Sequence, residues 1–590
     1  MKRRDFMKLL GSGIALSAFP LAAQTSVRKS QRQPNIVFFL VDDMGWQDTS
    51  LPFWYPNNGN SPKATVLNAR YHTPHMERMA REGMIFTAAY AQPVCSPTRC
   101  SVMSGMNAAR HRVTNWTAEV DGAPSNNGGP VNGVASPVWA INGLQPPGTL
   151  PKGTVKGAYN VPDRAYPATQ DVPYHMSKPY TCAQTLPMFL KMAGYSTVMA
   201  GKAHFASGNG FAPSSMVSPG QNPRLMGFDV NLCGSHKGQP SNYRADKGMR
   251  YGGEVFGLEK EQAAGHMLTN ALTRQAIAAI ETLQSQKPER PFFLYLGHFA
   301  LHLPCDNGHA FDSSRATDPD VLKDSENANP QDGLAWNAIE RNYGNLISGM
   351  DESLGHILDW AADQKARTGR DTLVVFMADN GGLVGQQQRS AMDSFKGNAP
   401  LKYGKGSCYE GGIREPFIAW MPGVLKAGEV NHTPIICEDL FPTFLDYAGV
   451  APETIASHLA STPSTVWKEG AVAQVLDGVS LRSTFEGKRT LSIDRPILIH
   501  SPNAWLRTAD RAYDFFTTLR VGDWKLIWHQ DLGVLELYNV VSDISELNDL
   551  SKTFPARTRK LAKQMANLLR ERGAQRPTRQ GQCVPWPDEL

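Results

Sequence analysis

Polar residues that could do chemistry follow four apolar segments of strand length, each at the point where the segment ends. Asp42 and Asp43 follow residues 36–41, Lys202 and His204 follow 196–200, His298 and His302 follow 292–296, and Asp379 and Asn380 follow 372–377. In an open α/β sheet the carboxyl ends of the parallel strands form the ligand crevice, so residues far apart in the chain converge there. These residue types predict a site for an anion and a metal ion.

The two acidic pairs carry the metal prediction. Asp42, Asp43, Asp379 and Asn380 supply carboxylate and amide oxygens with no soft ligand nearby in the sequence, which favours Ca²⁺ or Mg²⁺ over zinc. A single Asp pair after a strand is about as often a helix cap or a turn. Because a second pair follows another strand, the metal site is the better interpretation.

A large sheet is needed to position these residues. Strand-like segments, the last at 417–421, alternate with helix-like patterns at 185–193 and 267–283. This alternation predicts an α/β fold with a large mixed, mostly parallel sheet flanked by helices. Further on, short alternating segments precede an amphipathic helix at 556–572, which predicts a smaller α+β domain with an antiparallel sheet. We expect a catalytic domain at 25–485 and a C-terminal subdomain at 486–590.

Composition restricts the function classes. The chain has 590 residues, of which 41% are hydrophobic and 19% charged, as in a large globular protein. A net charge of +5 without a concentrated basic surface argues against nucleic-acid binding. The 8 cysteines include no Cys-x-x-Cys pair, so the chain lacks the usual spacing of zinc-binding and redox-active cysteines. The sequence leaves open whether one or two disulfides form.

The N-terminal segment has the pattern of an export signal. Lys2, Arg3 and Arg4 precede an apolar, Gly-containing run that ends near Ala23, so residues 1–24 resemble a twin-arginine signal peptide. The alternatives are a buried helix or a membrane anchor, but the run is short for a span, and no later stretch reaches about 18 apolar residues. We expect an exported protein, periplasmic or secreted, that uses the twin-arginine export machinery and has no transmembrane segment in its mature chain.

The best candidate nucleophile lies in a turn that opens into a helix, in the segment Cys95-Ser96-Pro97-Thr98-Arg99. This segment resembles the signature of the sulfatase family: Cys or Ser, any residue, Pro, usually Ser, then Arg. One short match is weak evidence for the family, but further matches follow in the same order as in the family, over roughly residues 34–577. They include Asp42-Asp43, Gly201-Lys202-Ala203-His204, His302-Leu303-Pro304, Asp379-Asn380-Gly381-Gly382 and Gly404-Lys405-Gly406.

The resemblance implies an alkaline phosphatase-like fold and a role for each matching residue. Cys95 would be oxidised to formylglycine (3-oxoalanine) by a maturation enzyme and would also bind one Ca²⁺ together with Asp42, Asp43, Asp379 and Asn380. Arg99, Lys202 and Lys405 would hold the sulfate and stabilise its charge, while His204 takes a proton during elimination of sulfate. His302, with Lys405, would contact the sulfate and help to protonate the departing alcohol.

Isolated residues of these types usually have simpler explanations. A single Lys or Arg is mostly a solvated surface charge, but Lys202 and Lys405 each lie in a Gly-flanked motif. A lone His is more often a hydrogen-bonded core or surface residue, and His298 keeps this interpretation because the family motif is met at His302.

Three positions depart from the family pattern. Thr98 stands where Ser is usual, Ala203 where Trp is common, and Leu301 where Pro commonly precedes the His. Thr98 keeps the hydroxyl, so we expect modification of Cys95 to survive. Ala203 and Leu301 leave the charged neighbours intact and affect the shape of the pocket.

These observations predict a Ca²⁺-dependent sulfatase that acts on a sulfated carbohydrate or an aryl sulfate ester. The alternative is a phosphodiesterase or phosphonate monoester hydrolase of the same superfamily, and a third possibility is an unmatured protein that binds sulfated sugars without turnover. Long loops at 121–179 and 234–243 are expected to shape the substrate pocket, with His236 and Lys237 as substrate-binding candidates in the second loop.

Overall fold

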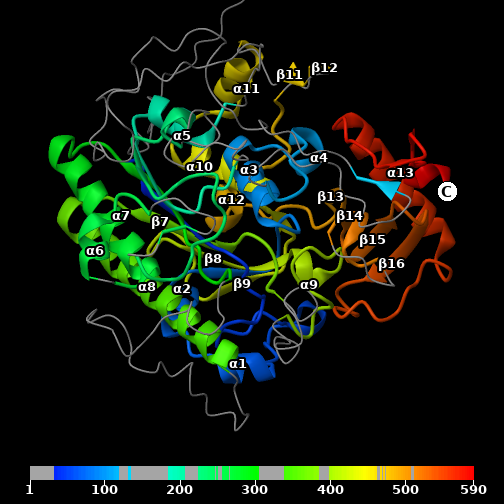
Figure 1. Ribbon diagram of the computed structural model, residues 1–590, viewed down its shortest axis with the longest axis horizontal. Helices are drawn as coiled ribbons and strands as arrows, with labels where there is room; N and C mark the ends of the chain where they lie inside the picture. The colour runs from blue at the N-terminus through cyan, green and yellow to red at the C-terminus, as the bar shows by residue number, and fades with distance from the viewer. Residues whose placement is uncertain are drawn as a thin grey trace, which may run out of the picture. The chain divides into compact units, whose positions relative to one another are not determined.

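A nine-stranded mixed sheet forms the centre of the chain (Figure 1). The computed structural model describes residues 32–117, 131–133, 184–205, 223–245, 248–249, 255–264, 266–303, 338–383, 398–461, 466–467, 470–471, 474–505 and 511–590. The strands of the sheet are β1 (Asn35–Val41), β2 (Met84–Tyr90), β4 (Ser196–Gly201), β5 (Val230–Leu232), β6 (Phe292–Gly297), β7 (Thr372–Ala378), β8 (Arg414–Trp420), β9 (Glu429–Asn431) and β10 (Ile435–Ile436).

The strand order explains why the site residues meet. The order is β10-β2-β8-β7-β1-β6-β4-β5, with β9 paired to β2. Strands β7, β1, β6, β4 and β5 are parallel neighbours, so their carboxyl ends lie along one edge. The predicted mixed, mostly parallel sheet is therefore confirmed, and β8, which runs antiparallel to β7 and β2, supplies the mixed part.

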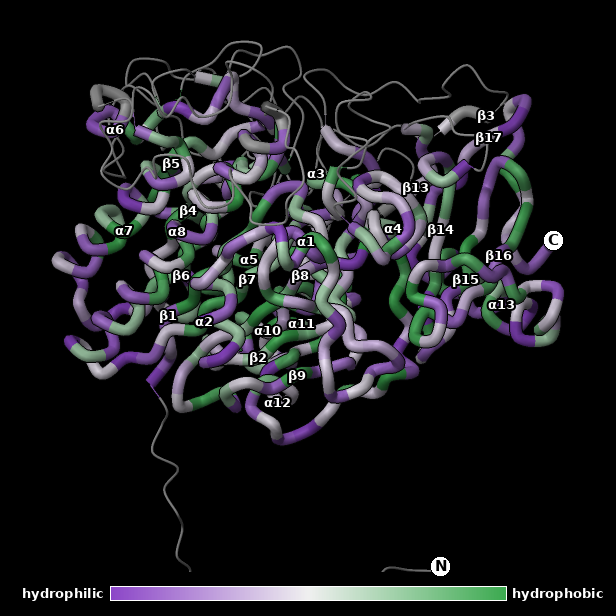
Figure 2. Tube along the Cα trace, turned by 90° about the horizontal axis from the view of Figure 1, so that it is seen from below, coloured by the Kyte–Doolittle hydropathy of each residue, from purple (hydrophilic) through white to green (hydrophobic). Residues whose placement is uncertain are grey.

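Helices cover both faces of this sheet, because its strands are apolar on both sides. In β1, Phe38 packs into the hydrophobic cluster on one face and Phe39 into the cluster on the other. The first cluster includes residues of α3 (Cys95–Ser104), α5 (Leu186–Met192) and α10 (Leu440–Tyr447), and the second includes residues of α2 (Pro74–Glu82), α7 (Leu268–Gln286) and α8 (Ala338–Thr368). Figure 2 shows the hydrophobic segments concentrated along these strands.

A smaller antiparallel sheet follows near the C-terminus, as predicted. It consists of β13 (Ile497–Ala504), β14 (Asp514–Val521), β15 (Trp524–His529) and β16 (Val534–Asn539), paired in that order. Helix α13 (Pro555–Glu571) packs Leu561, Met565 and Leu569 against Trp528 of β15 and its neighbours. The position of the boundary at residue 485 stays a prediction.

Short elements complete the described chain. The helices are α1 (Val66–Arg70), α4 (Ala108–His111), α6 (Glu259–Ala264), α9 (Glu410–Ile413), α11 (Pro452–Ser461) and α12 (Arg482–Phe485), and the strands are β3 (Val131–Asn132), β11 (Val466–Trp467), β12 (Gly470–Ala471), β17 (Thr578–Arg579) and β18 (Gln582–Cys583). None of the helices within the described ranges is long and apolar enough to cross a membrane. The predicted signal at 1–24 and nearly all of the loop at 121–179 lie outside the described residues.

His298 is a core residue, as expected from the sequence. Its side chain is fully buried, its ring lies 4.8 Å from that of Phe39, and its Nε2 lies 2.9 Å from Ser353 Oγ. Burial lowers the pKa of His298 to about 3, so the folded protein holds this imidazole neutral.

This burial predicts a pH-dependent contribution to folding. Because the folded-state pKa lies below the unfolded value of about 6.5, the stabilisation is complete above pH 6.5 and is lost as the pH falls towards 3. Urea unfolding should show that the stability advantage of wild type over His298→Gln shrinks by about 2–3 kcal/mol between pH 7.5 and pH 4.5. An advantage that does not change with pH would contradict a neutral, buried His298.

Candidate active site

The predicted site residues lie together at the carboxyl ends of four neighbouring strands and at the start of one helix. Asp42 and Asp43 follow β1, Asp379 and Asn380 follow β7, Lys202 and His204 follow β4, and His302 follows β6. Cys95 is the first residue of α3, and Lys405 precedes α9. Residues up to about 360 positions apart in the chain are thus in contact.

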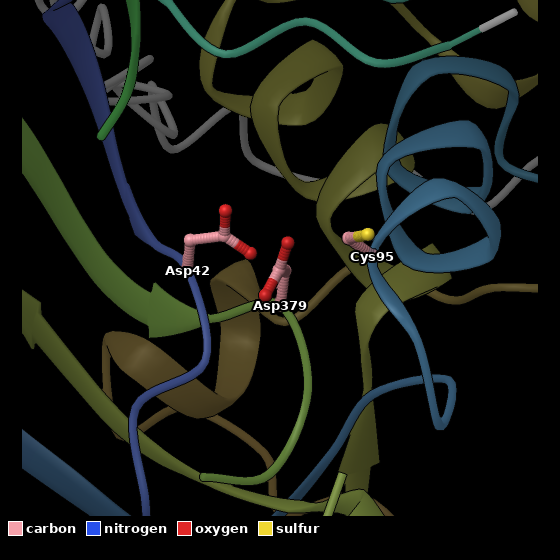
Figure 3. A group of neighbouring side chains, drawn as sticks. All are labelled: Asp42, Cys95 and Asp379. Carbon is pink, nitrogen blue, oxygen red and sulfur yellow. The ribbon is translucent and has the colours of Figure 1, made fainter. Parts of the chain in front are cut away.

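Cys95 points into the acidic cluster. Its Sγ and one carboxylate oxygen each of Asp42 and Asp379 all lie within 4.8 Å of one another. Figure 3 shows the two carboxylates near each other, with Cys95 beside them at the start of α3. This is the one group of three possible metal-ligating side chains found among the described residues. Cys95 is 2% exposed, so the thiol is almost fully buried.

The oxygens of this cluster fit a hard cation. Asp42 Oδ1, Asp43 Oδ2 and Asn380 Oδ1 are buried and have no hydrogen-bond partner within the described chain. Asn380 instead donates from Nδ2 to Asp43 Oδ1, at 2.7 Å. Buried oxygens left without a donor cost free energy, and a divalent cation that prefers oxygen ligands would satisfy them. Burial and the nearby Asp379 raise the pKa of Asp42, as expected for acids crowded together without a cation.

Three buried basic side chains neutralise the cluster. Arg99 donates to Asp379 Oδ2 from Nε at 2.8 Å, and its second nitrogen lies 2.7 Å from the same oxygen. Lys202 Nζ bonds to Asp42 Oδ2, and Lys405 Nζ lies 2.6 Å from Asp43 Oδ1. Burial disfavours ionised Asp43, but Lys405, His302 and Lys202 outweigh it and lower the Asp43 pKa. All three cations are at most 5% exposed.

His204 is held as a base facing Cys95. Its Nε2 lies 2.8 Å from the backbone oxygen of Thr117, and its Nδ1 lies 3.4 Å from Cys95 Sγ. Because a carbonyl oxygen can only accept, Nε2 carries the hydrogen and Nδ1 presents its lone pair to Cys95. Burial and then Lys202 lower the His204 pKa, so the ring is neutral. The residue adopts a left-handed backbone conformation, with a φ of 53°.

His302 lies at the outer side of the cluster. Its side chain is 17% exposed and its Nε2 is 3.7 Å from Asp43 Oδ2. Its Nδ1 donates to the backbone oxygen of Leu303 at 3.0 Å. Tyr243 donates its hydroxyl to the backbone oxygens of Phe299 and His302, at 2.6 and 2.5 Å. Tyr243 therefore fixes the turn that carries His302.

The sequence did not reveal two of the groups that shape the site. Thr98 was noted only as a variant of the motif, but its hydroxyl donates to the backbone oxygen of Asp379 at 2.6 Å and accepts from Gln92 N at 2.9 Å. Thr98 thus ties α3 to the strand end that bears the acidic pair. Thr117, which fixes the His204 tautomer, gave no signal because its backbone makes the contact.

The loop with His236 and Lys237 lies against His204. Ser235 accepts a hydrogen bond at its backbone oxygen from His204 N, at 2.9 Å. Both His236 and Lys237 are buried. At Gly238 a Cβ would lie 2.6 Å from His204 Cε1 and 2.8 Å from Nδ1, so the glycine permits the imidazole to pack on the loop.

The chain is similar to known sulfatases in sequence and to solved structures in fold. The sequence model of the family described as Sulfatase matches residues 34–133 and 153–450. A sulfatase of Formosa agariphila is 24% identical, over 96% of this chain and 93% of that protein. The N-acetylgalactosamine-6-sulfatase of Mus musculus is 27% identical, over 83% of this chain and 72% of that protein. The crystal structure of Ps i-CgsB in complex with k-i-k-neocarrahexaose gives a TM-score of 0.56 at 22% identity, covering 94% and 95% of the two chains.

The large mixed sheet with its C-terminal antiparallel sheet is the fold of alkaline phosphatase-like hydrolases. Within that class, the family match spans well over half of the sequence. The chain therefore belongs to the sulfatase family and is a sulfuric ester hydrolase.

The contact between Gly238 and His204 gives a prediction for activity. Gly238→Ala places a methyl group at less than van der Waals distance from the imidazole, so the ring must shift and its alignment with Cys95 changes. Sulfate release is expected to fall on the order of ten- to a hundredfold, as small misplacements of catalytic groups do. Initial rates and a thermal melt check this, and full activity in a folded variant would contradict it.

Proposed function

We propose that this protein is an exported, Ca²⁺-dependent sulfatase of sulfated carbohydrates that works through formylglycine derived from Cys95. The observation that carries the proposal is the position of Cys95 Sγ, within 4.8 Å of Asp42 and Asp379 oxygens and 3.4 Å from His204 Nδ1. The domain bounds given above, the signal at 1–24, its export machinery and a maturation enzyme belong to the same proposal.

Charge supports an anionic substrate. Asp42, Asp43 and Asp379 are matched by the three buried bases described above. Their formal charges cancel, so a bound divalent cation leaves the site positive. Asp42, Asp43, Asp379, Asn380 and modified Cys95 would hold that cation, which would supply a fixed positive charge next to the sulfate. A buried, preorganised positive site stabilises the charge that develops on a transferring sulfuryl group.

The side chains divide the proton transfers between them. Formylglycine in its hydrated form would supply two hydroxyls: attack of the first on sulfur would break the S–O bond to the alcohol, and deprotonation of the second would re-form the aldehyde and expel sulfate. The Nδ1 lone pair of His204 faces this position and accepts that proton. Lys405 and His302 both lie beside Asp43, and they would hold the sulfate and the oxygen of the departing alcohol.

Protonation of the alcohol by His302 needs a charged imidazole. Burial and then Lys405 lower the pKa of His302, whereas Asp43 raises it. A bound sulfate ester adds a negative charge beside the ring, which raises the pKa and favours protonation. His302 would therefore charge on substrate binding and lose its proton to the alcohol.

The carbohydrate preference rests on the names of relatives and on the loop at His204. Similar proteins include an N-acetylgalactosamine-6-sulfatase and a structure with a bound neocarrahexaose. Replacement of His236 or Lys237 should change the preferred sugar more than the activity on a small aryl sulfate, and equal losses on both would contradict a specificity role.

The test compares initial rates on matched aryl sulfate, aryl phosphate and aryl phosphonate esters, together with sulfate release from sulfated sugars. A sulfatase prefers the sulfate ester, and a large preference for phosphate or phosphonate would overturn the proposal. Peptide mass spectrometry across Cys95, with an aldehyde-trapping reagent, tests the nucleophile. An unmodified thiol on active protein would overturn the formylglycine part.

A further inference from the structure

The C-terminal sheet places an aromatic side chain beside the proposed sulfate site. Trp505 directly follows β13 (Ile497–Ala504). The Nζ of Lys405 lies 5.8 Å from the centre of the Trp505 ring, on the same side chain that contacts Asp43 at 2.6 Å. Trp505, which belongs to the predicted C-terminal subdomain, therefore lies next to Lys405, the side chain that would hold the sulfate.

The indole packs directly on the backbone next to Lys405. Gly406 has a φ of +85°, and a Cβ there would lie 2.2 Å from Trp505 Cε3, so the ring occupies the space that a side chain would fill. The Trp505 amide donates to Asp514 Oδ1 at 2.8 Å, and Cys408 donates from its amide to the backbone oxygen of Ala512 at 2.8 Å. These bonds hold the backbone on both sides of the contact in place, and Trp505 is half-buried.

A second tryptophan lies on the neighbouring segment. Trp116 is 47% exposed, although its neighbour Thr117 is buried and bonds to His204. Asn503, two residues before Trp505, donates from Nδ2 to Thr114 Oγ1 at 2.9 Å. The segments that carry the two tryptophans are therefore joined, one linked to His204 and the other to Lys405.

We propose that Trp505, with Trp116, forms an aromatic platform that binds the pyranose ring of the sulfated substrate. This inference rests on the proposed function, because it assumes that the sulfate lies at Lys405. Trp505 is half-buried and lies beside Lys405, so a sugar whose sulfate is held by Lys405 would come within reach of the ring. Flat aromatic faces bury the C–H surface of a ring, whereas they add nothing for a free sulfate ion.

The test separates ring binding from sulfate binding. The full-length mature enzyme and the variants Trp505→Ala, Trp505→Phe and Trp116→Ala are assayed on N-acetylgalactosamine 6-sulfate and on a sulfated carrageenan oligosaccharide. Inorganic sulfate serves as an inhibitor that reports the sulfate pocket alone. We expect KM for the sugar to rise about tenfold or more in Trp505→Ala and less in Trp116→Ala, with unchanged inhibition by sulfate. Trp505→Phe should restore most of the loss.

Trp524→Ala is the matched control. Trp524 lies in the same C-terminal sheet but contacts Phe554 and Arg557, so KM should stay at the wild-type value. An unchanged KM in Trp505→Ala, or an equal loss of inhibition by sulfate, would overturn the platform and leave Trp505 as packing for Lys405. Wild-type activity on an aryl sulfate but on neither sugar would also overturn it. A wild-type enzyme that hydrolyses no sulfate ester would instead overturn the proposed function.

Discussion

Cys95→Ala is expected to lower turnover of a sulfate ester on the order of a thousandfold or more, because it removes the proposed nucleophile. The surrounding site should survive. The acids and bases near Cys95 bond to one another, as Arg99 does to Asp379 and Lys405 to Asp43, and none of these contacts needs the thiol. The melting temperature should therefore stay within a few degrees of wild type.

Cys100→Ala provides the matched control for that substitution. Cys100 lies in the same helix, is fully buried, and donates weakly from Sγ to the backbone oxygen of Phe205 at 3.5 Å. Burial raises the pKa of its thiol, so it stays protonated and inert. Loss of its sulfur should cost about 1 kcal/mol of stability with little effect on turnover. Retention of a tenth or more of wild-type turnover in Cys95→Ala would contradict the nucleophile assignment.

Removal of the divalent cation is expected to abolish turnover and to lower the melting temperature by several degrees. Without a cation, Asp42, Asp43 and Asn380 each keep a buried oxygen that accepts no hydrogen bond from any residue the structure describes. A cation at about one hundred times its Kd would stabilise the folded state by about 2.7 kcal/mol. Dialysis against a chelator, followed by addition of Ca²⁺ or Mg²⁺, should restore both properties, with Ca²⁺ the more effective.

Two variants test whether the stabilising cation binds at this site or elsewhere on the protein. Asn380→Ala should lose most of the Ca²⁺-dependent rise in melting temperature. Asp351→Asn should keep it, since Asp351 is a buried carboxylate that accepts from the amides of His75 and Met76 on another part of the fold. A rise that is equal in wild type and Asn380→Ala would show that the ion binds elsewhere.

The sequence predicted the main features of the catalytic sheet because they depend on local patterns. Residues 36–41 form a continuous apolar run, and the structure buries all of them in β1. A polar pair follows each of two predicted strands, and parallel strands share a carboxyl edge. These two facts were enough to predict that Asp42 and Asp379 lie close together. Strand β2 and helix α8 were not predicted. The antiparallel pairing of β8 depends on partners distant in the chain, which no local pattern specifies.

The sequence by itself determined which residue types come together in the site, and therefore which chemistry the site allows. Only the tertiary structure decided how they are paired: Lys202 with Asp42, Lys405 with Asp43, and Arg99 with Asp379. It also decided the tautomer of His204, through a backbone oxygen at Thr117, and the place of Trp505 beside Lys405. The physical reason is that a strand or helix leaves its pattern in the local sequence, whereas these contacts join groups about 90 to 360 residues apart. Their geometry exists only after the sheet and its C-terminal neighbour have packed.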